Sequence, residues 1–134
     1  MCTNTSAFTE YLDRTPTSTS CRAPEVLMKC KKYTEKVDIW GLAIVFIQMD
    51  LGIGVFRGRT REDQLKEVYK YLGTLNEEEF EKVPESPSLS SFPHYPYLKS
   101  QPPLKRSIPG VLKTDDSHLI HFVDRALNYN PAQR

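Results

Sequence analysis

Residues 37–50 read VDIWGLAIVFIQMD, and this stretch decides the fold class of the chain. Only Gly41 and Gln48 interrupt the apolar run between Asp38 and Asp50. Its β-branched residues would also suit a buried strand, but a run of about a dozen residues favours a helix. Because the run is apolar on every face, we expect a buried core helix that ends at the following Gly-Ile-Gly. It is well short of the roughly 20 residues that span a bilayer.

Apolar residues at helical spacing predict two further helices. The first covers residues 61–72, between a Thr60 N-cap and a stop at Gly73. The second covers residues 115–128 and starts at two aspartates. Residues 24–28 suit a single helical turn that begins at a proline. The chain is therefore predicted to be mainly α, with no clear strand.

The remaining segments lack a helical or alternating pattern. Residues 1–22 are rich in Thr and Ser and are predicted to form a loop. Residues 76–113 contain seven prolines among Ser, Tyr and Lys, which predicts an extended Pro-rich insert. An insert of this length inside a compact domain is usually functional.

Composition excludes several classes of protein. The net charge of +1 gives no reason to expect nucleic acid or a membrane surface as a partner. The three cysteines are odd in number and lack Cys-x-x-Cys spacing, so we expect a reducing, intracellular location, either cytoplasmic or nuclear. His118 and His121 are one helical turn apart, but no third ligand is obvious and no metal site is predicted.

Three short motifs follow one another along the chain: Ala23-Pro24-Glu25, Asp38-Ile39-Trp40 and Asn130-Pro131-Ala132-Gln133-Arg134. Each motif alone is weak, but their order and spacing resemble the C-terminal lobe of eukaryotic protein kinases. The variant of the first motif that begins at Cys21 resembles the Tyr-Arg-Ala-Pro-Glu form of the cyclin-dependent, MAP and glycogen synthase kinases. The closest resemblance is to glycogen synthase kinase 3.

The resemblance implies a partial, helical C-terminal lobe of the protein-kinase fold. Residues 1–36 would be the activation segment and the Ala-Pro-Glu helix, and residues 37–134 the rest of the partial lobe. It also implies a buried carboxylate–guanidinium bridge between Glu25 and Arg134. The same likeness makes Asp38 an acceptor for the catalytic loop and places Trp40 at the start of the central helix. The alternative for the first pair is two surface charges, and for Asp38 a helix N-terminal aspartate.

Further roles are implied in the activation segment. Thr15 falls where glycogen synthase kinase 3 has its activating tyrosine, and Ser18 where the family has a residue bonded to the catalytic aspartate. Arg22 resembles the arginine beneath the substrate-docking loop. Thr3 stands where an Asp-Phe-Gly motif would supply the magnesium-binding aspartate, and Phe8 replaces a lysine of the phosphate-priming pocket.

A surface for helical partners is implied on the second helix. It would consist of Leu65, Val68, Tyr69 and Leu72, together with Phe80. Amphipathic helices commonly bind in such grooves. The alternative is that the same stripe belongs to the core, which is at least as plausible for Leu65 and Leu72.

The implied function is ATP-dependent phosphorylation of protein Ser or Thr, with ATP and Mg²⁺ as the family's cofactors. These 134 residues contain no Gly-rich loop, no β3 lysine and no His-Arg-Asp loop, so we expect no catalytic residue and no competence in this chain alone. Either it is a kinase fragment that needs its missing half, or it is a pseudokinase-like module that binds a protein partner. An unrelated helical protein is the third alternative.

A stability prediction follows from the same resemblance. The central helix normally packs against a helix that precedes this region, so we expect an exposed apolar face, marginal stability and a need for a protein partner.

Overall fold

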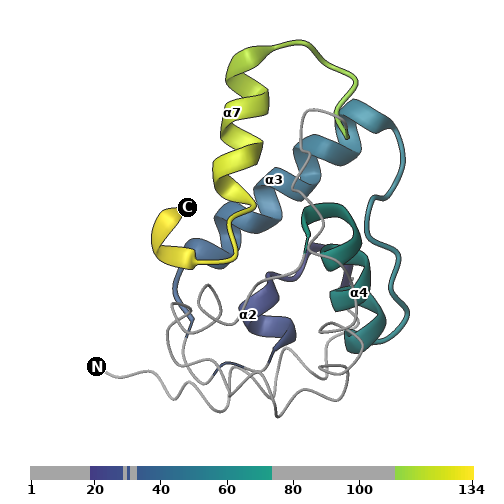
Figure 1. The fold of residues 1–134 in the computed structure, drawn as a ribbon, viewed down its shortest axis with the longest axis vertical. Helices are drawn as coiled ribbons and strands as arrows, with labels where there is room; N and C mark the ends of the chain where they lie inside the picture. Colours follow the sequence, from purple (N-terminus) through teal and green to yellow (C-terminus); the bar gives the residue numbers. More distant parts are fainter. Residues whose placement is uncertain (1–18, 29, 31–32, 74–110) are drawn as a thin grey trace.

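The computed structural model describes residues 19–28, 30, 33–73 and 111–134 of the chain (Figure 1). The elements follow in the order η1 (Thr19–Cys21), α2 (Pro24–Leu27), α3 (Lys36–Leu51), α4 (Arg61–Leu72), α7 (Ser117–Ala126) and η3 (Pro131–Gln133), where η denotes a 3₁₀ turn. No strand occurs within the described ranges. The prediction of a mainly α chain is therefore confirmed.

Helix α3 crosses the middle of the described part, with α7 standing on one side and α2 and α4 lying on the other (Figure 1). Helix α3 packs against α7, and α2 packs against α4. The short turn η1 contacts both α3 and α4, and η3 returns the end of the chain to α3. The largest fully buried side chains are those of Trp40, Phe56, Leu27, Ile44, Ile47 and Leu127.

Helix α3 extends one residue beyond each end of the predicted run 37–50, and it is not buried on every face. Gly52 ends the helix with a φ of 71°, and its N–H donates to the Gln48 carbonyl. Glycine suits this left-handed position because it has no Cβ. The residues Trp40, Ala43, Ile44 and Ile47 are buried, whereas Leu42, Val45 and Met49 are 44%, 43% and 72% exposed.

The exposed residues of α3 share one side of the helix. Leu42, Val45 and Met49 follow one another at spacings of three and four residues, which places them on a single face. Asp38, four residues before Leu42, is exposed at the start of the same face. We call these four residues the α3 stripe. The prediction of burial on every face was wrong, and the expectation of an exposed apolar face is confirmed.

Helix α4 begins and ends at the residues that the sequence indicated. The Thr60 hydroxyl accepts a hydrogen bond from the Asp63 N–H at 3.1 Å, and the Gly73 N–H donates to the Tyr69 carbonyl. The N-cap bond satisfies an N–H that has no partner inside the helix. Phe56, in the connection from α3, packs edge-on against Tyr71 at a centroid distance of 5.4 Å.

Helix α7 is two residues shorter at each end than the predicted 115–128. Asp116 is the N-cap, and its carboxylate accepts from the N–H groups of His118 (2.8 Å) and Leu119 (3.3 Å). Phe122 meets Phe46 of α3 edge to face at 5.6 Å. The Asp50 carboxylate accepts from the backbone N–H groups of Lys113 (2.6 Å) and Thr114 (3.1 Å), which ties the end of α3 to the approach to α7.

Of the predicted Pro-rich insert 76–113, only the last three residues lie in the described ranges, so that prediction falls outside them. Within the described residues, no helix combines the length and the hydropathy that crossing a membrane would require.

Candidate functional site

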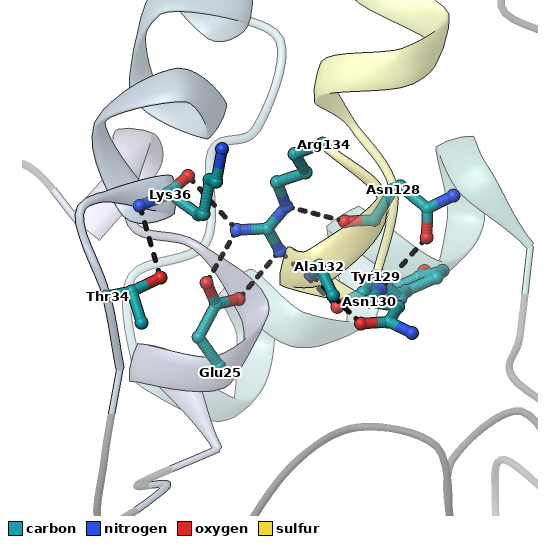
Figure 2. A network of polar contacts seen from close by, with 8 residues as sticks. All are labelled: Glu25, Thr34, Lys36, Asn128, Tyr129, Asn130, Ala132 and Arg134. Carbon is teal, nitrogen blue, oxygen red and sulfur yellow. Dashed lines mark hydrogen bonds and ion pairs between the residues drawn. The ribbon is translucent and has the colours of Figure 1, made fainter.

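The guanidinium of Arg134 is the centre of a network of polar contacts (Figure 2). Nη1 and Nη2 donate in parallel to the two carboxylate oxygens of Glu25, at 2.5 and 2.7 Å. The Arg134 side chain is 0% exposed and that of Glu25 is 3% exposed. This bidentate geometry is the strongest form of an arginine–carboxylate pair. The predicted bridge is present and buried, and the alternative of two surface charges is wrong.

Three backbone carbonyls take the remaining donors of the guanidinium. Nε donates to Asn128 at 2.7 Å, Nη1 to Lys36 at 3.3 Å and Nη2 to Tyr129 at 3.4 Å. An arginine side chain has five N–H donors, and all five are used here. The network therefore joins α2, the start of α3 and the end of the chain at one point. We call these contacts the arginine clasp.

Local sequence signals place both halves of the arginine clasp. Pro24 fits the first position of α2, where its missing N–H costs nothing, and the Ala23 carbonyl accepts from Val26 and Leu27. At the other end, the Asn130 side chain caps η3 by accepting from the Ala132 N–H at 3.0 Å. These caps fix the backbone on either side of the ion pair, so the side chains meet with little freedom.

Trp40 lies directly against the clasp. Its ring is fully buried, and the Arg134 Cζ lies 5.1 Å from the ring centroid. A guanidinium over an indole face gains a cation–π attraction. The indole Nε1 is buried and has no hydrogen-bond partner among the described residues, and the ring contact is the interaction that places Trp40 against the clasp. The predicted structural set Ala23, Pro24, Glu25, Trp40 and Arg134 is thus gathered in one place.

Asp38 does not join this network. It belongs to the first turn of α3, where an acidic side chain suits the helix dipole, and it is exposed. No described residue bonds its carboxylate, so its implied role as an acceptor for a catalytic loop stays a prediction.

The predicted docking residues are only partly described. Arg22 is half-buried between η1 and α2. Thr15, Ser18 and Phe80 lie outside the described residues, as do Thr3 and Phe8.

The four predicted partner-binding residues of α4 are core residues. The exposed fractions of Leu65, Val68, Tyr69 and Leu72 are 6%, 0%, 6% and 4%. They are buried because α4 packs this face against α2. Burial also raises the pKa of the Tyr69 hydroxyl above its ordinary value. The structure thus corrects the partner-surface prediction in favour of the core alternative.

Gln64 is a buried polar residue that the sequence reasoning missed. Its side chain is fully buried, its Oε1 accepts from the Gly58 N–H at 2.9 Å, and its Nε2 donates to the Ser20 carbonyl at 3.2 Å. A signal was available, since Gln64 lies four residues before Val68 and therefore on the apolar side of α4.

No group of three His, Cys, Asp or Glu side chains in the described residues could hold a metal ion. His118 and His121 are both exposed on α7.

Comparison with known proteins identifies a family that matches this chain. The protein kinase domain family matches residues 3–134. Cyclin-dependent kinase C-3 from Oryza sativa subsp. japonica is 34% identical over 84% of this chain and 33% of its own length. A probable CTD kinase subunit alpha homolog from Encephalitozoon cuniculi is 32% identical over 84% of this chain and 32% of its own length.

Mitogen-activated protein kinase mpkA from Aspergillus fumigatus is 28% identical over 84% of this chain and 26% of its own length. The chain thus spans a third or less of the length of each of these relatives.

Proposed function

The chain belongs to the protein kinase domain family, and from this premise we propose that its residues form part of the helical C-terminal lobe of a serine/threonine kinase. Similarity to both cyclin-dependent and MAP kinases supports placing the chain in the group that contains these two kinase classes. The finer resemblance to glycogen synthase kinase 3 rests on the sequence motifs alone.

The arginine clasp is the observation that carries the proposal. It joins Glu25 of the Ala-Pro-Glu motif to Arg134 across 109 residues, with both side chains buried. Through Arg134, this bridge links Glu25 of α2 to the Lys36 carbonyl at the start of α3 and so fixes the position of α2. In a phosphotransferase the segment equivalent to the one before α2 supports the protein substrate, and transfer depends almost wholly on positioning.

The cofactor requirement places limits on what this chain does alone. Phosphoryl transfer by the family uses ATP and Mg²⁺, and a magnesium ion takes carboxylate ligands. No group of three His, Cys, Asp or Glu side chains that could hold a metal ion occurs among the described residues. The proposal assigns binding of the protein substrate to this chain and binding of the nucleotide to another part of a kinase.

The α3 stripe supports a requirement for a protein partner. Three apolar side chains between 43% and 72% exposed lie on one helix face, beside an aspartate with no described partner. We propose that the nucleotide-binding part of a kinase covers this face. An intracellular location stays a prediction from the cysteine pattern.

Two measurements test the proposal. Isothermal titration of the 134-residue chain with Mg-ATP should show no binding, and tight binding would overturn the division of roles. In the second, residues 20–134 replace the matching segment of the Oryza kinase. This chimera should bind ATP, melt cooperatively and phosphorylate the protein substrate of the parent. A folded, ATP-binding chimera without transfer would refute the substrate-side role.

A further inference from the structure

Three segments that are distant in sequence meet at the amide of Gln64. These are η1 with Ser20, the loop before α4 with Gly58, and α4 itself. Gln64 is one of only two buried polar or charged residues in the described part of the chain, and the other is Glu25 of the arginine clasp. A buried polar side chain is costly unless its hydrogen bonds are made, so its retention here needs a reason.

The two hydrogen bonds of Gln64 use opposite properties of its amide. Oε1 accepts from the Gly58 N–H at 2.9 Å, and Nε2 donates to the Ser20 carbonyl at 3.2 Å. The second bond spans 44 residues. Only a group that carries both a donor and an acceptor satisfies both partners, which excludes a carboxylate and an ammonium.

The loop leaves Gln64 no room to shift. A Cβ added at Gly58 would overlap the backbone N and Cα of Gln64 and lie 2.6 Å from the carbonyl carbon of Asp63. The loop is thus pressed against the first turn of α4. The same turn is fixed by the Thr60 cap, whose hydroxyl accepts from Asp63. These contacts fix the position of the Gln64 amide, and the amide in turn fixes the Ser20 carbonyl through its hydrogen bond.

We propose that Gln64 is a positioning residue that sets the backbone of η1, and through it the approach to Arg22. The inference rests on the proposed function, which assigns this segment to support of the protein substrate. The arginine clasp fixes the segment beyond Ala23 from the α2 side. Gln64 fixes it before Arg22, so the docking segment is held at two points, Ser20 and Glu25, which are five residues apart.

The test replaces the amide by an isosteric carboxyl group. In Gln64→Glu, the ionised side chain would put an acceptor against the Ser20 carbonyl and lose that bond. The protonated carboxylic acid offers one O–H donor and one acceptor, and restores both bonds. Burial raises the pKa of a carboxyl group, so the change should fall between about pH 5 and about pH 9.

The measurement is hydrogen exchange of the full 134-residue chain, corrected for the intrinsic effect of pH. Amides of residues 20–23 in Gln64→Glu should match the wild type near pH 5 and lose about tenfold or more in protection near pH 9. In Gln64→Leu they should be unprotected at both pH values. Amides of α7 should keep their protection throughout. The other titratable or charged groups of the three segments are present in the wild type and set its baseline: Cys21, Arg22, Arg57, Arg59, Arg61, Glu62, Asp63, Lys66, Glu67, Tyr69, Lys70 and Tyr71.

Two results would overturn the proposal. One is wild-type protection of residues 20–23 in Gln64→Glu near pH 9. The other is an equal loss in α7, because the amide would then be a general part of the core. The kinase chimera separates this inference from the proposed function. There, Gln64→Glu should raise KM for the protein substrate near pH 9 and leave KM for ATP unchanged. An inactive chimera with the pH-dependent protection intact would refute the proposed function and leave Gln64 as the positioning residue.

Discussion

Removing the guanidinium of the arginine clasp should cost more stability than any other single charge deletion in the described residues. In Arg134→Met, the Glu25 carboxylate stays 3% exposed and loses both of its described donors. Three backbone carbonyls lose a donor as well. Breaking a buried ion pair in this way costs about 3–5 kcal/mol, because the remaining charge is left unpaired.

That loss is large against the stability of the whole chain. A domain of ordinary stability unfolds with about 5–15 kcal/mol, and the exposed α3 stripe places this chain at the low end. Arg134→Met should therefore shift the urea midpoint strongly or abolish cooperative unfolding at neutral pH. The single tryptophan, Trp40, is a natural probe because it lies 5.1 Å from the guanidinium, and circular dichroism gives an independent second signal.

Lys66 supplies a matched control. It pairs with Asp63 at 3.6 Å on the surface of α4, where the two side chains are 39% and 49% exposed. Lys66→Met also replaces a paired cationic side chain by methionine and should alter the unfolding free energy by less than about 1 kcal/mol. In a double-mutant cycle, Glu25→Gln combined with Arg134→Met should cost less than the sum of the single changes. The reasoning fails if Arg134→Met costs no more than Lys66→Met.

Three further outcomes are expected. Gly58→Ala should destabilise the chain by about 1–3 kcal/mol, because the added Cβ would overlap the backbone of α4. Gly41→Ala is the control: its Cβ would meet only the Cys21 carbonyl at 3.8 Å, so this change should be neutral or gain up to about 1 kcal/mol of helix propensity. Equal shifts of the melting temperature in the two variants would contradict this reasoning. Met49→Lys should lower self-association in sedimentation velocity without lowering the melting temperature, and a wild-type chain that is already a stable monomer would argue against the stripe. Burial raises the pKa of the Tyr69 hydroxyl, so folding favours its protonated form. The free energy of unfolding should therefore keep its full value below about pH 10 and fall as the pH rises above it. Tyr69→Phe should reduce this dependence of the unfolding free energy on pH, as measured by urea titrations at several pH values.

Local signals predicted the bounds of α4 but not those of α7. Thr60 and Gly73 are single, unambiguous cap residues on either side of a clear apolar period. Asp115 and Asp116 are equivalent as sequence signals, and only the backbone decides that Asp116 is the cap. At the other end, Leu127 continues the apolar pattern by packing into the core after the helix has stopped.

Burial was less predictable than helix formation because it depends on neighbours. The run in α3 is apolar on every face, but its sequence does not say which faces the chain itself covers. The opposite error occurred in α4, where an apolar stripe was assigned to a partner although α2 covers it. Gln64 was missed because its two partners, six and 44 residues away, meet it only in the folded chain.

The two sides of α3 therefore differ in whether the described residues satisfy them. On one side, all five donors of Arg134 are satisfied by described residues, so the arginine clasp needs nothing from outside. On the other side, the side chains of Leu42, Val45 and Met49 in the α3 stripe stay exposed, and we propose that a protein partner covers them. A partner at about 100 times its Kd stabilises the folded chain by about 2.7 kcal/mol. Breaking the clasp costs about 3–5 kcal/mol, so a partner at that concentration leaves a net loss of stability in a chain where Arg134 no longer meets Glu25.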